Sequence, residues 1–420
     1  MDFMTLPDGP LTLQNLTVPA CLIGTPGDLV PIDLHLREGK ISDQPGRPVD
    51  LKGAMVFPAF TDMHTHLDKG HIWPRAANPD GSFEGALRTA ASDRQTHWDA
   101  DDVSARMDFA LRCAYAHGTR AMRTHIDSIP PQDRISWPVL QEVRASWKGR
   151  IDLQAACLVG CEAVERDGSF VQIADLVAQA GGVLGMVAYP VPDLSDRIRA
   201  FLDLAWDRGL DVDFHVDETL DPTSEALRMV AQAVLETGFE NRVVVGHLCS
   251  LSMQAEDRAT ETMDLVASAG VHVVSLPMCN LYLQDRQHGT PRMRGIAPVH
   301  ELKARGVNVS FASDNTRDPF YAYGDLDMIE VMREATRIGH LDHSAEDWVE
   351  AFTTNPARAC GFELPSLKPG ASADLVICRA RSWTELFARP QSDRIVLRDA
   401  VQIERALPDY AELDHLMRTP

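Results

Sequence analysis

Short apolar runs alternate with amphipathic stretches along most of the chain. Within the stretch 101–116, for example, Val103, Met107, Ala110, Leu111 and Ala114 fall on one helical face. Eight such strand–helix units, with near-continuous apolar strands, predict an α/β fold in which a parallel sheet closes into a (β/α)8 TIM barrel. The apolar runs are residues 54–60, 119–125, 151–159, 183–189, 210–215, 242–247, 271–276 and 307–312.

The two ends of the chain have a different pattern. Residues 1–53 predict short strands and turns, for example at 11–18 and 39–42. Two helices are expected next to the barrel, at 345–355 and ending near Cys360, and strands return over 366–405. Neither end alone could bury a sheet. We therefore predict a small β-sandwich domain built from residues 1–53 and 366–420, beside a barrel domain of residues 54–365.

Composition narrows the class of protein. Hydrophobic residues make up 45% of the 420 residues and charged residues 24%, which is ordinary for a globular protein. A net charge of −21 disfavours nucleic acid and anionic membranes as partners and suits a neutral or cationic small molecule. No apolar run approaches the ~20 residues of a membrane span. The first 18 residues contain no basic residue of the kind that begins a secretory signal.

The 8 cysteines form no CxxC pair and lie mostly in apolar runs. This usage predicts buried free thiols in a reducing cytoplasm.

Histidines and an aspartate stand where several predicted barrel strands end. His64 and His66 follow the first apolar run, and residues two apart on a strand point to the same face. An HxH pair alone could be two surface histidines, and a lone histidine at a strand end is more often a satisfied polar residue. His215 and Asp314, however, end the fifth and eighth runs, and His247 ends the sixth. Because barrels carry their sites at the carboxyl ends of the strands, this convergence favours function.

Three neutral imidazoles and one carboxylate, from His64, His66, His215 and Asp314, suit one zinc or ferrous ion. A bound divalent metal lowers the pKa of a water molecule from about 15.7 towards ~7. Asp314 could both bind the metal and accept that water's proton. Glu218, three residues after His215, could carry a proton to a ring nitrogen and a leaving group. Its alternative role is a helix N-terminal acid, favoured there by the helix dipole.

The order HxH, HxxE, lone histidine and final aspartate resembles the amidohydrolase superfamily, and the chain is most similar to its cytosine deaminase branch over nearly its whole length. The resemblance implies a metal site at the four residues above, Glu218 as proton shuttle and His247 as the group that stabilises the developing oxyanion. It also implies Phe320 near the pocket mouth, with Asn315, Glu218 and His247 in substrate binding, and a homo-oligomer. The matching segments are FPAFTDMHTHLDK, GTRAMRTHID, DFHVDE, VVVGHLCSLS, CNLYLQDR, RMRGIAPVHEL, FASDNTRDPFYAYG and KPGASADLVI.

The chain departs from the cytosine deaminase pattern at two positions that bear on the substrate. Gly160 stands where cytosine deaminases have a glutamine that reads the amide edge of the pyrimidine. Asp314 is followed by Asn315, where that branch has a second aspartate. The Asp-Asn pair and Lys69 also resemble the N-isopropylammelide amidohydrolase branch, which removes an alkylamine from a triazine ring.

We therefore expect a hydrolase acting on carbon–nitrogen bonds, with one divalent transition metal ion, zinc or iron, per chain. Its expected reaction is deamination of a cytosine-like aminated N-heterocycle with release of ammonia. The alternative is removal of a larger amine from an aminotriazine-like ring, or opening of a cyclic amide. A barrel that had lost catalysis and served as a scaffold would lack ligands, and here all four are present.

Overall fold

Parallel strands form a closed barrel in the computed structural model, which describes residues 4–165, 168–287, 289–390 and 393–417. Five strands pair in the order β13-β12-β11-β10-β9 and three in the order β6-β7-β8. Parallel bridges from Thr65 to Asp314 and from Ala156 to Val183 join these two groups at both seams, so the sheet closes on itself. The barrel strands are β6 (Phe60–Thr65), β7 (Thr119–Asp127), β8 (Asp152–Leu158), β9 (Leu184–Ala188), β10 (Val212–Val216), β11 (Val243–His247), β12 (His272–Ser275) and β13 (Val309–Phe311).

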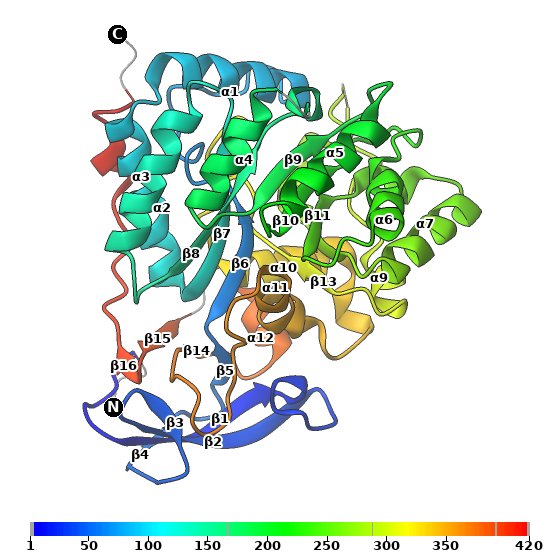
Figure 1. Cartoon of the computed structure of the whole chain (residues 1–420). Helices are drawn as coiled ribbons and strands as arrows, with labels where there is room; N and C mark the ends of the chain where they lie inside the picture. Colours follow the sequence, from blue (N-terminus) through cyan, green and yellow to red (C-terminus); the bar gives the residue numbers. More distant parts are fainter. Residues whose placement is uncertain (1–3, 166–167, 288, 391–392, 418–420) are drawn as a thin grey trace.

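Helices lie outside the barrel strands (Figure 1). The predicted helix at 101–116 is α2, with Asp99 accepting a hydrogen bond from the backbone N–H of Asp102 at its start and Gly118 in the left-handed region at its end. The others are α1 (Phe83–His97), α3 (Asp133–Ser146), α4 (Phe170–Gln179), α5 (Leu194–Trp206), α6 (Ala226–Thr237), α7 (Glu256–Ser268), α8 (Pro277–Leu283), α9 (Val299–Ala304), α10 (Met328–Gly339), α11 (Thr354–Cys360) and α12 (Trp383–Ala388). None of these helices, within the described ranges, is long and apolar enough to cross a membrane.

Strands from the N-terminal part of the chain and strands between residues 375 and 402 form a second sheet, the end sheet, in the lower part of Figure 1. Its order is β16-β15-β14-β5-β1-β2-β3, with β4 also paired to β1. All of these strands share one hydrogen-bonded sheet, so the joining of both ends agrees with the sequence but the predicted β-sandwich is not confirmed. The strands are β1 (Leu11–Pro19), β2 (Leu29–Arg37), β3 (Lys40–Ser42), β4 (Arg47–Asp50), β5 (Met55–Pro58), β14 (Leu375–Cys378), β15 (Arg394–Arg398) and β16 (Val401–Gln402).

The apolar run 54–60 serves two sheets, which corrects the prediction of a single barrel strand. Its first part, β5, pairs antiparallel with β14, with Val56 opposite Ile377. The chain then leaves the end sheet, and β6 begins at Phe60 beside Thr119 of β7. The helix expected at 345–355 is also different, because a 3-10 helix covers Trp348–Phe352 and α11 begins at Thr354.

Strand periodicity builds two polar layers inside the barrel. Asp62 and His64, Arg123 and His125, and Asp213 and His215 are pairs two residues apart on their strands and are all buried. In the lower layer the Arg123 guanidinium lies 2.7 Å from an Asp213 carboxylate oxygen, and Ser313 donates its hydroxyl to Asp62 over 2.5 Å. The upper layer consists of histidines. The polar interior therefore lies directly beneath the carboxyl ends of the strands.

Candidate active site

Four side chains predicted as metal ligands converge at the carboxyl ends of β6, β10 and β13. The Nε2 atoms of His66 and His64 lie 3.2 and 3.6 Å from Oδ1 of Asp314, and the rings of His64 and His215 are 4.5 Å apart. Asp314 has a φ of 63° and donates its backbone N–H to the carbonyl of His64 over 2.9 Å. A non-glycine residue in this left-handed conformation is strained, and such strain is typical of functional sites.

The free polar atoms of this cluster fit a metal ion. Both ring nitrogens of His64 and of His215, Nδ1 of His66 and both carboxylate oxygens of Asp314 are buried without a hydrogen-bond partner among the described residues. An unsatisfied buried polar group costs about 1–3 kcal/mol, so several such groups in one place fit a site that binds a metal ion. The donor atoms of His64, His247 and Asp314 lie within 4.8 Å of one another, as do those of a second group that contains His64, His66 and His215.

Burial sets the protonation of these groups. It lowers the pKa of His64, His66 and His215 well below the ordinary histidine value, and the neighbouring histidines lower it further. The imidazoles are therefore neutral, as metal ligands must be. Burial raises the pKa of the Asp314 carboxyl, and a cation bound at the site would favour its ionised form.

His125 belongs to the same cluster and was not among the predicted site residues. Its ring lies 4.1 Å from that of His64 and 4.7 Å from that of His215, and its Nε2 is 3.1 Å from Oδ1 of Asp213. Its donor atom belongs to the four-histidine group with His64, His66 and His215. The signal was present in the segment RTHID, where His125 stands two residues after Arg123 at the end of the second barrel strand.

Glu218 and His247 form a separate pair beside the ligands. Nδ1 of His247 is 3.4 Å from Oε1 of Glu218, and the amide nitrogen of Asn280 lies 3.0 Å from the same Nδ1. An amide donor there leaves the ring proton on Nε2, which has no partner among the described residues. Gln284 donates to the backbone carbonyl of Glu218 over 3.1 Å. Asn280 and Gln284 come from the CNLYLQDR segment, which thus positions this pair.

The pKa values of Glu218 and His247 are shifted in opposite directions. Burial, together with the charge of Asp314, raises the pKa of Glu218 well above the ordinary carboxyl range, although Lys69 acts against this. Burial lowers the pKa of His247 to about 4, so its imidazole is a neutral donor. A carboxyl held near protonation can both give and take a proton, whereas a neutral imidazole with a free N–H can donate a hydrogen bond.

Asn315 and Phe320, both predicted to contact substrate, line the same cavity. The Asn315 side-chain amide donates to Asp318 over 2.7 Å, so its orientation is fixed. The ammonium group of Lys69 lies 5.1 Å from the centre of the Phe320 ring and 3.2 Å from an Asp127 oxygen. Arg94 also pairs with Asp127, over 2.7 Å.

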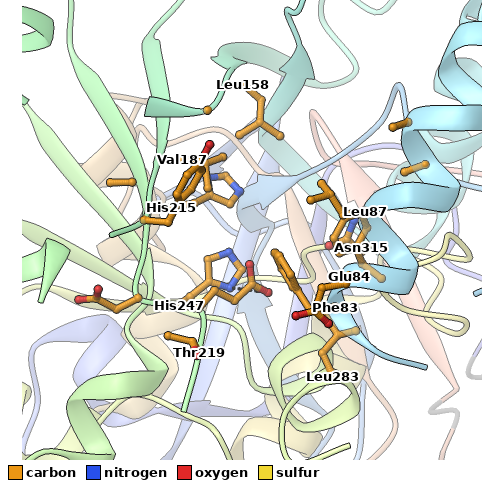
Figure 2. Close-up of a pocket in the computed structure, with 18 of the residues that line it drawn as sticks. Phe83, Glu84, Leu87, Leu158, Val187, His215, Thr219, His247, Leu283 and Asn315 are labelled. Carbon is orange, nitrogen blue, oxygen red and sulfur yellow. Dashed lines mark ion pairs between the residues drawn. The ribbon is translucent and has the colours of Figure 1, made fainter. Parts of the chain in front are cut away.

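The cavity above these groups has a volume of about 850 Å³. In Figure 2, His215 and His247 lie across the cavity from Phe83, Glu84 and Leu87 of α1. Apolar side chains such as Leu158, Val187 and Phe320 share the lining with the polar groups described above. A largely apolar cleft with a few converging polar groups is typical of a small-molecule site.

A closed (β/α)8 barrel with a histidine–aspartate cluster at the carboxyl ends of its strands has the arrangement in which barrel enzymes carry their active sites. The chain belongs to the Amidohydrolase family, whose model matches residues 47–137 and 172–402. It is therefore a hydrolase acting on carbon–nitrogen bonds, and the predicted resemblance is confirmed.

Several proteins of known activity are similar to this chain. The chain is 49% identical over 428 aligned positions to a pterin deaminase from Rhizobium rhizogenes, covering 98% of both chains. It is 24% identical to N-isopropylammelide isopropyl amidohydrolase from Pseudomonas, covering 90% of this chain and 94% of that one. A structure of 5-methylcytosine deaminase from Klebsiella pneumoniae has the same fold, with a TM-score of 0.82 at 23% identity over 95% of this chain and 98% of that one.

Proposed function

We propose that the protein is a metal-dependent deaminase that hydrolyses the exocyclic amino group of a pterin-type bicyclic ring and releases ammonia. The observation that carries this proposal is a cavity of about 850 Å³ directly above the complete ligand cluster, in a chain aligned over 98% of its length with a pterin deaminase. A two-ring heterocycle suits a cavity of this size. Cytosine, the ring type expected from the sequence, has the same amino-substituted carbon beside a ring nitrogen but is smaller.

His64, His66, His215 and Asp314 would hold one ion, zinc or iron, because three neutral imidazoles and a carboxylate suit these metals. When bound, the ion would act as a Lewis acid and supply hydroxide at neutral pH. His125 lies beside this set, where its contact with Asp213 fixes the ring next to His64 and His215.

The remaining groups would move protons. Water oxygen adds to the amino-bearing carbon, the carbon–nitrogen bond breaks, and the two protons of the water end on a ring nitrogen and on the departing ammonia. Asp314 would accept the first proton, and Glu218 would deliver protons to the ring and the leaving amine. His247 would donate a hydrogen bond from its Nε2–H to the developing oxyanion, while Asn280 holds the opposite side of the imidazole.

A second candidate is release of a larger amine from an aminotriazine. It is favoured by the Asp314-Asn315 pair and Lys69, together with the 24% identity to N-isopropylammelide isopropyl amidohydrolase. Lys69 is already paired with Asp127, and burial, which alone would lower its pKa, is outweighed by the surrounding carboxylates. This pairing favours a structural role for Lys69 over direct contact with a leaving group.

Three broader expectations belong to the proposal. Residues 54–365 would form the catalytic domain, supported by residues 1–53 and 366–420. None of the 8 cysteines, all of which lie in the described part of the chain, forms a disulfide, and this supports our expectation of a reducing cytoplasmic compartment. Assembly into a homo-oligomer stays a prediction.

The test is a substrate panel assayed for ammonia with zinc-loaded and iron-loaded protein. Pterin should be consumed with one ammonia released per ring, and cytosine should be the poorer substrate. N-isopropylammelide is included with detection of isopropylamine. A clear preference for cytosine, or amine release from the triazine alone, would overturn the pterin assignment.

A further inference from the structure

Gly160 ends the extended segment after β8, and the space beside it is occupied. Its backbone has a φ of −71° and a ψ of 152°, which any residue can adopt, and it bridges to Val187 of β9. A Cβ atom added at Gly160 would nevertheless overlap the carboxylate of Glu162, closer than van der Waals contact allows. Absence of a side chain at position 160 therefore leaves room for the Glu162 carboxylate to fold back onto the backbone.

Neighbouring elements hold Glu162 in this place. The hydroxyl of Tyr189, just past the end of β9, donates a hydrogen bond to Oε2 of Glu162. Arg197 of α5 donates to the backbone carbonyls of Glu162 and Cys161 over 2.7 and 3.2 Å. The 3-10 turn Cys161–Ala163 is thus fixed against α5, and its carboxylate is paired with a hydroxyl instead of a cation.

Glu162 and Tyr189 both line the cavity that contains His215 and Glu218. The strand-end residues next to them, Leu158 and Val187, lie across the view in Figure 2 from Leu283 of α8. Lys69 and Arg94, which also line the cavity, are both paired with Asp127. Glu162 is itself exposed, so the β8–β9 wall presents this carboxylate as an acceptor at the solvent-facing rim of the cavity.

We propose that Glu162, held by Tyr189, is a substrate-specificity residue that accepts a hydrogen bond from an N–H or O–H group on the part of the substrate distant from the reacting amine. The carboxylate takes the place that a side chain at position 160 would otherwise fill. It selects rings that carry a hydrogen-bond donor and rejects rings that carry an anionic substituent, since like charges in a partly enclosed site repel. This inference rests on the proposed deaminase function.

The experiment compares kcat/KM for pterin, 6-hydroxymethylpterin and 6-carboxypterin with metal-loaded enzyme. Wild type should prefer the hydroxymethyl ring to the carboxyl ring. In Glu162→Gln this preference should fall by at least about tenfold, within the range expected for a hydrogen bond to a charged group. Gly160→Ala, whose Cβ displaces the carboxylate, should change the preference in the same direction. The matched control is Glu165→Gln, on the same loop but outside the cavity lining, which should leave the preference within about twofold.

An unchanged preference in both Glu162→Gln and Gly160→Ala, or an equal change in Glu165→Gln, would overturn the assignment of Glu162. If wild type with metal consumes none of the three pterins, the proposed function itself fails. The two failures are therefore distinguishable. The preference is a ratio within each variant, so a partial loss of folded protein does not alter it.

Discussion

At the scale of single residues, the side chains of the site differ in their protonation, and these differences suit them to different tasks. The three histidines that we propose as ligands are buried deeply enough to stay neutral, and Asp314 is the one carboxyl among the four predicted ligands. Oε1 of Glu218 lies 3.4 Å from Nδ1 of His247. The pKa of the Glu218 carboxyl is raised, whereas that of the His247 imidazole is lowered. We therefore assign proton delivery to Glu218 and oxyanion stabilisation to His247, whereas Asp314 would both hold the cation and accept a proton.

The ligands give the first prediction. His64→Ala, His215→Ala and Asp314→Ala should each lose the metal and abolish turnover, because each removes a donor from the cluster. Metal content by elemental analysis and ammonia release measure the two effects. Arg381→Gln, an exposed residue of the end sheet region, is a control that should keep both. A variant with full turnover and no metal would contradict the ligand assignment.

Glu218 and His247 give the second prediction. Glu218→Gln preserves shape but cannot carry a proton, so turnover should fall by about 10²–10⁴ with metal retained. His247→Asn removes one donor to the oxyanion and should cost about 10²–10³ in turnover. Binding of a neutral ring should be weakened less in His247→Asn than in Glu218→Gln. Near-normal turnover in Glu218→Gln would leave Asp314 as the only proton carrier and refute the shuttle role.

Individual residues of the site show which parts of it the sequence could predict and which it could not. The four ligands stood out because each follows an apolar strand and their chemistry agrees. His125 did not stand out, since its role depends on Asp213, which is 88 positions away in the printed sequence and meets it only through the closed barrel. Gly160 was recognised as a missing glutamine, but the carboxylate that fills its space depends on a turn and on Tyr189.

At the scale of elements, closure of the barrel depends on two seams. Between β8 and β9 the strands are joined by isolated bridges, and Gly185 of β9 lies directly against the carbonyl oxygen of Cys157 in β8. A methyl group at this glycine would overlap backbone, which cannot move aside as a side-chain tip can. The absence of a side chain at Gly185 is therefore part of how the ring closes.

The third prediction follows from this contact. Gly185→Ala should force β8 and β9 apart and lower stability by about 1–3 kcal/mol, the usual cost of overpacking. Thermal unfolding measures it. Gly339→Ala is the matched control, since the nearest atom there is the tip of Leu341 at 3.3 Å, and its melting temperature should change little. A melting temperature equal to wild type in Gly185→Ala would show that this seam is not tightly packed.

A buried ion pair links the end sheet to α10. Arg394 of β15 makes two 2.7 Å contacts with Asp327, whose carboxylate also accepts the Ile329 N–H at the start of the helix. Burial alone would raise the pKa of Asp327, but Arg394 and His117 outweigh it and hold the pKa well below the ordinary range. A lowered folded pKa means that this stabilisation is present above the unfolded value of about 3.9 and is lost as pH falls below it.

The fourth prediction is that Asp327→Asn lowers stability at pH 7 by about 3–5 kcal/mol, because Arg394 is left buried without its partner. Denaturant midpoints between pH 8 and 2 measure it, and the difference from wild type should be constant down to about pH 4 and narrow below that value. Glu385→Gln breaks the exposed pair with Arg381 and should change little. A difference that stayed constant with pH would contradict the sign derived from the lowered pKa.

The strands also show that the pattern of apolar residues alone does not predict which sheet a strand joins. The apolar run 54–60 was continuous, so the sequence did not reveal that the chain changes sheets at Pro58. The periodicity of α2, by contrast, located this helix to within one residue of each observed end. Helices of this kind are set by local spacing and caps, whereas sheet membership depends on partners far away in sequence.

At the scale of the whole molecule, the net charge is −21, and two cations that line the cavity, Lys69 and Arg94, are both paired with Asp127. An acidic protein of this kind suits a neutral heterocycle better than a polyanion. The closed barrel brings ligands from β6, β10 and β13 to one rim, so the site exists only when the whole ring is formed. Metal binding should therefore raise the melting temperature, because the binding free energy is linked to folding.

The central claim is that this chain hydrolyses an amino group from a pterin-type ring by means of a metal held at His64, His66, His215 and Asp314. The most direct measurement is ammonia release from pterin by protein stripped of metal with a chelator and then reloaded with one equivalent of zinc or iron. We predict no release from the stripped protein, restored release of one ammonia per pterin after reloading, and none from reloaded His215→Ala. Undiminished release from metal-free protein, or no release from pterin under any loading, would contradict the account.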